Sequence, residues 1–247
     1  GNTDGIVIVT LDTRAHRVML TSIIRDALVE RPDGVIGRIN YIAKNYGPEA
    51  LCKVISQHVG VKIEKYLLFD FSQIASIVDF LGGVDIEITS TESNYLQRYA
   101  IPKDSTTPRL RGAGTYHFNG HSAVIYMRIR KVGGGGDFMR TQRVRTVLST
   151  LADQCREITL EEARALVDSV LENTTLTNMS TDEMVEAMNY AMELRGCTVE
   201  ELRLPPDGAA TPITYAGMSV QEIDWVACRQ AMDEYLQNSF LVLDDEE

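Results

Sequence analysis

The sequence has no long hydrophobic run and carries a deficit of positive charge. Its 247 residues contain no apolar stretch long enough to cross a bilayer and no recognisable secretory leader. Because it begins with Gly1 rather than Met, we expect it to be a piece of a longer protein. The 24 Lys and Arg are outnumbered by 35 Asp and Glu, giving a formal net charge of −11. This balance argues against a general nucleic-acid binder, which needs a basic surface.

Cysteine and histidine are also sparse, which excludes several kinds of site. The four cysteines, Cys52, Cys155, Cys197 and Cys228, form no C-x-x-C pair, so a structural zinc site is not expected. Three of them fall in helix-like patterns, where they are either small buried side chains or partners in one disulfide. His117 and His121 are separated by an Asn-Gly turn, so no metal pair is expected there. H-E-x-x-H, G-x-S-x-G and P-loop motifs are all absent.

What is present is an alternation of strand-like and helix-like segments. Strands are predicted at 6–11 and 17–23, joined as a hairpin, and at 65–69, 84–88 and 199–204. Helices are predicted at 39–46, 48–58, 72–81, 119–128, 137–152, 160–171, 181–194 and 222–237, with loops at 30–38 and 91–114. The apolar run 6–11 predicts a strand covered on both faces. We therefore expect a single three-layer α/β/α domain over 1–240, its central mixed sheet flanked by helices, and an acidic tail at 241–247.

One segment of this acidic chain is rich in arginine. Residues 128–145 carry six basic side chains, Arg128, Arg130, Lys131, Arg140, Arg143 and Arg145, against the single acid Asp137. Such a cluster repels itself unless an anion or solvent compensates it. The planar guanidinium binds two phosphate oxygens at once. The segment is either a phosphate-binding site or a solvated basic face beside a flexible loop.

The spacing within this segment favours the anion site. Asp137, Arg140 and Arg143 recur every three residues, so they share roughly one face in the first turns of a helix, where the dipole attracts anions. The glycines at 133–136 allow a backbone to approach a ligand closely. Arg128 and Arg130 face the same way only if the chain is extended there, which we expect before the glycines.

A second candidate follows the second predicted strand. Arg25 and Asp26 come directly after it, at the strand end where α/β proteins place their sites. The alternative is a simple surface ion pair. An apolar groove for a lipid tail could be lined by the helices at 48–58 and 72–81, although such apolar stripes also serve as core.

Four blocks of sequence follow one another in an order typical of one family. Residues 22–29, SIIRDALV, resemble S-I-P-R-D-T-x-V, and residues 38–43, RINYIA, resemble K-I-N-x-A. Residues 79–84, DFLGGV, match D-x-x-G-G-V. The most specific block, FNGHSAVIYMRIR and then GD with Arg140 and Arg143, matches L-N-G-x-x-A-L-x-Y-x-R-x-R…G-D-x-x-R-x-x-R-Q. Over about residues 4–150 the chain thus resembles the LytR-CpsA-Psr family.

The resemblance implies an enzyme on the outer face of the bacterial cytoplasmic membrane, held by an N-terminal segment that is not in this sequence. Such enzymes are Mg²⁺-assisted phosphotransferases that move a glycopolymer, such as teichoic acid or capsule, from a polyprenyl-pyrophosphate carrier onto peptidoglycan. The implied pyrophosphate ligands are Arg25, Arg128, Arg130, Arg140 and Arg143. Asp4, twenty-one residues before Arg25, matches the Asp of the family's S-D-T element and is the implied Mg²⁺ ligand. Arg25, Asp137 and Arg140 are the implied catalytic residues, with Asp137 either orienting the arginines or acting as base.

The chain also departs from the family pattern. Val144 stands where the family has Gln, Asn2 stands where it has the Arg of R-S-D, and its earlier aspartate-bearing strand is absent. These departures keep open a non-catalytic module that binds polyprenyl pyrophosphate. An envelope-related transcriptional attenuator, which the family's older name suggests, would need a DNA-binding element, and the sequence contains none that we recognise.

Overall fold

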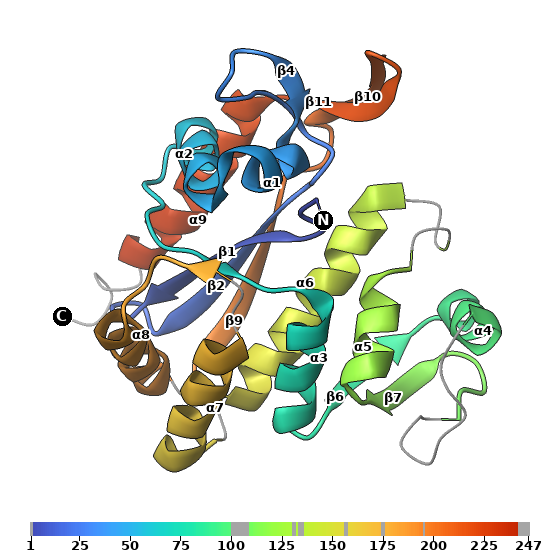
Figure 1. Cartoon of the computed structure of the whole chain (residues 1–247), viewed down its shortest axis with the longest axis vertical. Helices are drawn as coiled ribbons and strands as arrows, with labels where there is room; N and C mark the ends of the chain where they lie inside the picture. The colour runs from blue at the N-terminus through green and yellow to red at the C-terminus, as the bar shows by residue number, and fades with distance from the viewer. Residues whose placement is uncertain are drawn as a thin grey trace. The chain divides into compact units, whose positions relative to one another are not determined.

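The structure is a computed structural model that describes residues 2–99, 109–129, 132, 136–155, 158–173, 176–194 and 196–241. Strands and helices are mixed along the chain, so the predicted α/β class is confirmed (Figure 1). The chain divides into two compact units, unit 1 with residues 1–66 and 200–247 and unit 2 with residues 67–199. The single domain over 1–240 stays a prediction. Of the predicted acidic tail at 241–247, residues 242–247 lie outside the described residues.

Unit 1 is built on the predicted hairpin. Strands β1 (Ile6–Asp12) and β2 (Arg17–Ile23) pair antiparallel, with Ile6 opposite Ile23, and β9 (Thr198–Leu204) completes the strand order β1-β2-β9. The prediction that the first strand is covered on both faces is wrong. Val9 is 59% exposed, because β1 lies at the edge of this sheet and β2 occupies the buried centre.

Helices of unit 1 begin and end close to the predicted residues. The predicted helix 39–46 consists of a 3-10 turn η1 (Ile39–Tyr41) and a short α1 (Ile42–Tyr46). Helix α2 (Pro48–Val59) starts with proline, whose fixed φ suits a first turn, and ends at Gly60 in the left-handed conformation. It packs against α9 (Trp225–Leu241), where His58 stacks on Trp225 at 4.3 Å between ring centroids.

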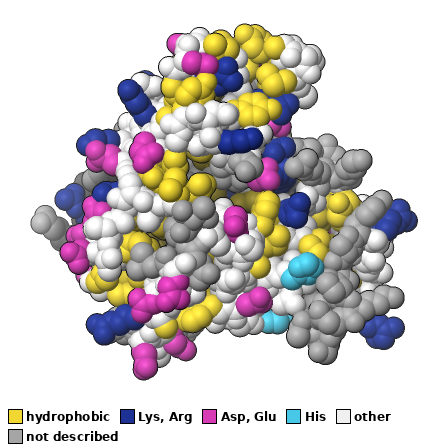
Figure 2. All heavy atoms as spheres, in the orientation of Figure 1, with side chains coloured by type: hydrophobic (Ala, Val, Ile, Leu, Met, Phe, Trp, Pro, Cys, Tyr) yellow, Lys and Arg dark blue, Asp and Glu magenta, His cyan; other side chains and the backbone are white. Residues whose placement is uncertain are grey.

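Two short hairpins of unit 1 were not predicted. Strand β3 (Leu28–Glu30) pairs with β4 (Ile36–Arg38), which occupies the last residues of the region predicted as loop 30–38. Strand β10 (Ala210–Tyr215) pairs with β11 (Met218–Ile223). The Arg38 guanidinium donates to the Ser219 carbonyl at 2.7 Å and so joins the two hairpins. Figure 2 shows hydrophobic side chains gathered over this region, where Val35, Ile36 and Tyr215 are exposed.

Unit 2 packs helices against a two-stranded pair. Helix α3 (Phe71–Phe80), strand β6 (Val84–Ile88), helix α5 (Gly120–Met127) and helix α6 (Gly136–Cys155) agree with the predicted segments. The partner of β6 is β7 (Gly114–Phe118), a strand that was not predicted. Helix α4 (Ser90–Tyr99) lies in the region 91–114 that was predicted as a loop, so that prediction is wrong there. The alternating apolar side chains of β6 join Phe118 and the apolar face of α6 in one core.

The remaining elements of unit 2 form a second group. Only Leu67–Leu68 of the predicted strand 65–69 forms β5, which pairs with β8 (Leu176–Thr177). Helices α7 (Leu160–Asn173) and α8 (Thr181–Glu193) confirm the predictions at 160–171 and 181–194. No helix within the described ranges is both long enough and apolar enough to cross a membrane.

The glycine-containing motifs of unit 2 have a packing role. A Cβ on Gly120 would lie 2.0 Å from the Ala75 carbonyl oxygen, so the backbones of α3 and α5 meet at a distance only glycine allows. Asp79 accepts a hydrogen bond from the Gly120 amide at 2.7 Å, and Asn119 caps α5 by accepting from the Ser122 amide. The D-x-x-G-G-V and N-G blocks therefore hold one helix pair together and fix where α5 begins.

Candidate functional site

Asp4 and Arg25 lie together at the open end of the β1–β2 hairpin. The Arg25 Nη1 donates to Asp4 Oδ1 at 2.7 Å, and the two side chains are 15% and 28% exposed. Arg25 follows the end of β2 directly, as predicted. The structure therefore brings together the predicted pyrophosphate ligand and the predicted metal ligand of unit 1.

Asp26 and Arg38 extend this charged group. Asp26 Oδ1 lies 4.0 Å from Arg25 Nε and 3.6 Å from Arg38 Nε. The backbone of buried Asn40 ties the group down, because its amide donates to the Arg25 carbonyl and its carbonyl accepts from the Thr3 amide. Two acids and two arginines thus lie together, and backbone hydrogen bonds support them. The alternative of a simple surface ion pair at Arg25 and Asp26 is therefore wrong. An external anion at this site would compete with the two carboxylates for the guanidinium groups.

The fit of a metal ion rests on Asp4. Across the part of the chain that the structure describes, no group of three or more His, Cys, Asp or Glu side chains is placed to hold a metal. Mg²⁺ often takes only one or two protein carboxylates beside phosphate oxygens, and Asp4 offers one. Cys52, Cys197 and Cys228 carry free thiols, and the side chain of Cys155 lies outside the described residues.

Arg128 lies at the end of α5 and is exposed. It forms the C-cap with helical angles (φ −87°, ψ −3°), so the prediction of an extended backbone is wrong at this residue. Its guanidinium lies 5.2 Å from the centre of the Phe71 ring, a cation–π contact that orients the side chain. Arg130, expected to face the same way, lies outside the described residues.

The arginines of α6 are buried rather than solvated. Arg140 is 2% exposed and Arg143 is 1% exposed, which excludes the alternative of a solvated basic face for these two residues. Asp137 lies in the first turn of α6, as predicted, but its side chain is outside the described residues. Arg128, Arg140 and Arg143 belong to unit 2, whereas Asp4 and Arg25 belong to unit 1.

The guanidinium of Arg143 donates its hydrogen bonds to other groups of the protein. Its Nε donates to Glu92 Oε1 at 2.7 Å, its Nη1 to the Ile129 carbonyl at 3.2 Å and its Nη2 to the Val132 carbonyl at 3.1 Å. Sequence reasoning missed Glu92. The signal was present, because Thr89-Ser-Thr-Glu92 is a capping box in which Glu92 accepts from the Thr89 amide at 2.9 Å.

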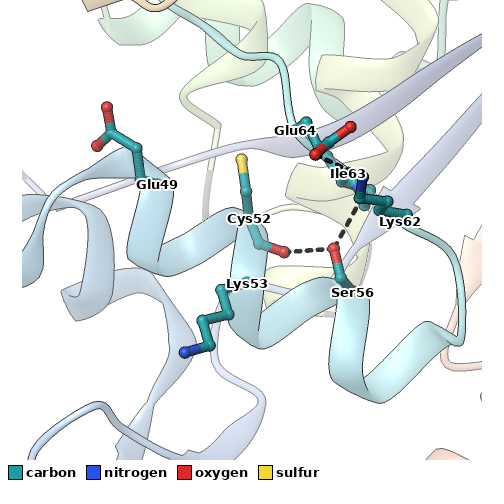
Figure 3. A pocket seen from close by; sticks show the side chains of 7 residues that line it. All are labelled: Glu49, Cys52, Lys53, Ser56, Lys62, Ile63 and Glu64. Atoms are coloured by element: carbon teal, nitrogen blue, oxygen red, sulfur yellow. Dashed lines mark hydrogen bonds and ion pairs between the residues drawn. The ribbon is translucent and has the colours of Figure 1, made fainter.

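A surface hollow lies elsewhere in unit 1. Its volume is about 370 Å³, and it opens between α2 and residues 62–64 (Figure 3). Its lining is Glu49, Cys52, Lys53, Ser56, Lys62, Ile63 and Glu64. Charges of both signs line it, and burial raises the pKa of the Cys52 thiol. It includes no predicted site residue and is not the expected apolar groove, which stays a prediction.

Two curated relatives are teichoic acid transferases by name. The chain is 26% identical over 162 residues to the polyisoprenyl-teichoic acid–peptidoglycan teichoic acid transferase TagV of Bacillus subtilis, covering 62% of this chain and 39% of the relative. It is 25% identical over 223 residues to the TagU enzyme of that description from Bacillus mycoides, covering 87% and 67%. The chain thus spans between about two fifths and two thirds of these relatives.

Solved structures and the family model agree on the fold. A structure described as TagT bound to LIIa-WTA has a TM-score of 0.77 at 20% identity, covering 96% of this chain and 85% of that one. A LytR-CPS2A-psr family protein, YwtF (TagT), with bound octaprenyl pyrophosphate lipid has a TM-score of 0.72 at 19% identity, covering 97% and 85%. The LytR_cpsA_psr family model matches residues 1–233. The chain therefore belongs to the LytR_cpsA_psr family.

Proposed function

We propose that this chain is the catalytic domain of a transferase that moves a glycopolymer from a polyprenyl-pyrophosphate carrier onto peptidoglycan. The family match over residues 1–233 carries the proposal, because relatives within it are named as teichoic acid transferases. The relative solved with octaprenyl pyrophosphate supports the choice of donor. The arginines retained here supply the charge that such a donor requires.

The proposed reaction is a phosphoryl transfer. An acceptor hydroxyl oxygen attacks the phosphorus that bears the glycan, a new O–P bond forms, and the bond from that phosphorus to the bridging oxygen breaks. Polyprenyl phosphate leaves with the bridging oxygen and the bonding electrons, and the hydroxyl proton passes to a base. Catalysis of this kind depends mainly on positioning and on neutralising charge.

The residues of this chain divide these tasks. Arg25, Arg128, Arg130 and Arg140 neutralise the pyrophosphate, with Arg25 exchanging its contact to Asp4 for phosphate oxygens. Asp137 either accepts the hydroxyl proton or orients the arginines. Arg143 supports its neighbours, because its three nitrogens already donate to protein oxygens.

A magnesium ion completes the proposed site. When bound, Mg²⁺ supplies positive charge at the phosphate oxygens. Asp4 is its proposed protein ligand, since one carboxylate beside phosphate oxygens suits this ion. The proposed location is the outer face of the cytoplasmic membrane, with an anchor upstream of this sequence and no nucleic-acid partner.

Transfer of a radiolabelled glycan from polyprenyl pyrophosphate to peptidoglycan tests the proposal. Arg128→Ala should lower turnover by about 100-fold, the usual loss when a transition-state charge partner is removed. Arg164→Ala, at an exposed arginine of α7 in the same unit, is the matched control and should retain full turnover. If the wild type transfers no glycan, the proposed function is contradicted. If Arg128→Ala turns over as fast as the wild type, the proposed role of Arg128 is contradicted.

Val144 favours a second candidate, a module that binds the lipid pyrophosphate without transferring the glycan. The family's Gln is replaced by a valine that is 7% exposed and packed in the core of unit 2. Mass spectrometry of lipid extracted from purified protein distinguishes the two. Bound polyprenyl phosphate without turnover supports the module, whereas turnover rejects it.

A further inference from the structure

A buried ion pair joins α4 to α6 in unit 2. The side chains of Glu92 and Arg143 are 7% and 1% exposed, and their contact measures 2.7 Å between Oε1 and Nε. Removing two charges from water is costly, so a buried pair is stable only with close geometry and further hydrogen bonds. Both partners have them. The buried phenol of Tyr126, whose pKa is raised to about 12 by burial and by Glu92, lies 6.0 Å from the Arg143 guanidinium.

Glu92 is anchored on its own side of the pair. Its Oε2 accepts from the amide and the hydroxyl of Thr89, both at 2.9 Å, so the carboxylate is fixed at the start of α4. Its Oε1 remains for Arg143. The Glu92 carboxylate thus caps the first turn of α4 and also fixes the orientation of the Arg143 guanidinium.

The other end of the guanidinium holds the backbone that follows α5. Nη1 and Nη2 donate to the carbonyls of Ile129 and Val132, which flank residues 130 and 131. Ile129 is fully buried, whereas its neighbour Arg128 is exposed. The fork of Arg143 therefore fixes the main chain one residue after an exposed arginine, among helices α4, α5 and α6 (Figure 1).

We propose that Glu92 and Arg143 are positioning residues that hold the backbone carbonyls of Ile129 and Val132 and thereby aim Arg128 at the pyrophosphate. The inference rests on the proposed function and assigns Glu92 a role in it. A lysine at 143 would keep a positive charge beside Glu92, but its single ammonium lacks the planar fork that reaches two carbonyls and a carboxylate.

The test compares Arg143→Lys and Glu92→Gln with a matched control, Arg145→Lys. Arg145 is a buried arginine of the same helix whose guanidinium donates to Gln142 of that helix. Two measurements are made on each protein: binding of a soluble polyprenyl pyrophosphate, and amide hydrogen exchange of residues 128–132. We expect both variants to exchange faster in this segment and to bind about 10- to 100-fold more weakly, as expected for a misplaced contact group. The control should match the wild type in both.

A double-mutant cycle separates positioning from general loss of structure. If Arg143 acts through Arg128, Arg128→Ala combined with Arg143→Lys binds no more weakly than Arg128→Ala alone. Additive losses, or wild-type binding by both single variants, would overturn the inference. If the wild type itself binds no pyrophosphate lipid, the proposed function fails, and unchanged exchange in the variants would reject the backbone clamp independently.

Discussion

Asp4 and Arg25 lie opposite each other across the end of the β1–β2 hairpin, with Oδ1 and Nη1 2.7 Å apart. The strand register accounts for this meeting. Ile6 pairs with Ile23 at the end of the hairpin, and Asp4 and Arg25 each lie two residues beyond this pair. A hairpin thus brings together two side chains that are 21 residues apart in the sequence. Each charge neutralises the other, so the pyrophosphate of the proposed donor would have to compete with Asp4 for Arg25.

Replacing Asp4 should separate metal dependence from folding. Asp4→Asn is expected to lower transfer by about 100-fold and to weaken its dependence on added Mg²⁺, because one transition-state charge contact is lost. Stability should change by less than about 1 kcal/mol, as for other partly exposed pairs. Transfer rates across a Mg²⁺ titration measure the first effect, and urea unfolding measures the second.

Asp12 provides the control for Asp4 at the other end of the same hairpin. It accepts from the Arg14 and Ala15 amides in the turn. Asp12→Asn should therefore affect stability but leave the Mg²⁺ dependence unchanged. A Mg²⁺ response of Asp4→Asn equal to that of the wild type would remove Asp4 from the metal site.

Restoring the family's glutamine should destabilise this chain. Val144 is 7% exposed within the apolar core of unit 2, so Val144→Gln buries an amide among aliphatic side chains. The expected loss of unfolding free energy is about 1–3 kcal/mol. Val185→Gln, at a 40% exposed position of α8, should change stability by no more than about 0.5 kcal/mol. Equal stability of the two variants would show that the site around residue 144 accommodates a polar group.

The β6–β7 pair should respond to pH through His117. The pKa of His117 is raised by its hydrogen bond to Asp85 and then by that to the Gly82 carbonyl, both 2.8 Å long. A raised folded-state pKa means that the stabilisation is complete below the usual value of 6.5 and is lost as pH rises through the higher folded value. Because the pair is exposed, the effect should stay below about 1 kcal/mol.

Melting temperatures across pH test this expectation. The deficit of His117→Ala relative to the wild type should be largest in acid and should shrink above neutrality. His121→Ala controls for the loss of another imidazole from the surface. A deficit of His117→Ala that grows with pH would reverse the assigned sign.

Gly120→Ala should disrupt the contact between α3 and α5. The new Cβ would meet the Ala75 carbonyl oxygen at 2.0 Å, and backbone atoms on both sides leave little room for adjustment. We expect a loss of about 3 kcal/mol or more, at the upper end of overpacking effects, measured by chemical denaturation. Gly37→Ala is the control, since its nearest neighbours belong to the flexible side chain of Arg31. Similar losses in both variants would contradict the close-packing role of Gly120.

Several features of the fold were determined by local sequence. The turn between 6–11 and 17–23, the proline and glycine that bound α2, and the caps of α3 and α5 act within a few residues of the chain. The family blocks likewise predicted the arginines and Asp4 as site residues, and these roles stay predictions. The strands β7 and β10 and helix α4 were not predicted. Many of their side chains are polar or exposed, so the sequence lacks the regular apolar pattern by which such elements are recognised, and each is stabilised by packing on a partner strand or helix.

The sequence by itself determined the mixed α/β class, the family and the arginine-rich segment, because these follow from residue order and local pattern. Only the tertiary structure decided how individual charges are used. It paired Arg25 with Asp4 through strand register, left Arg128 exposed at a helix end, and buried Arg143 against Glu92 and two carbonyls. An arginine's charge is the same at each position, but its burial and its partners depend on segments distant in sequence. These distinguish the exposed Arg128 from the buried Arg143, whose guanidinium donates to protein oxygens.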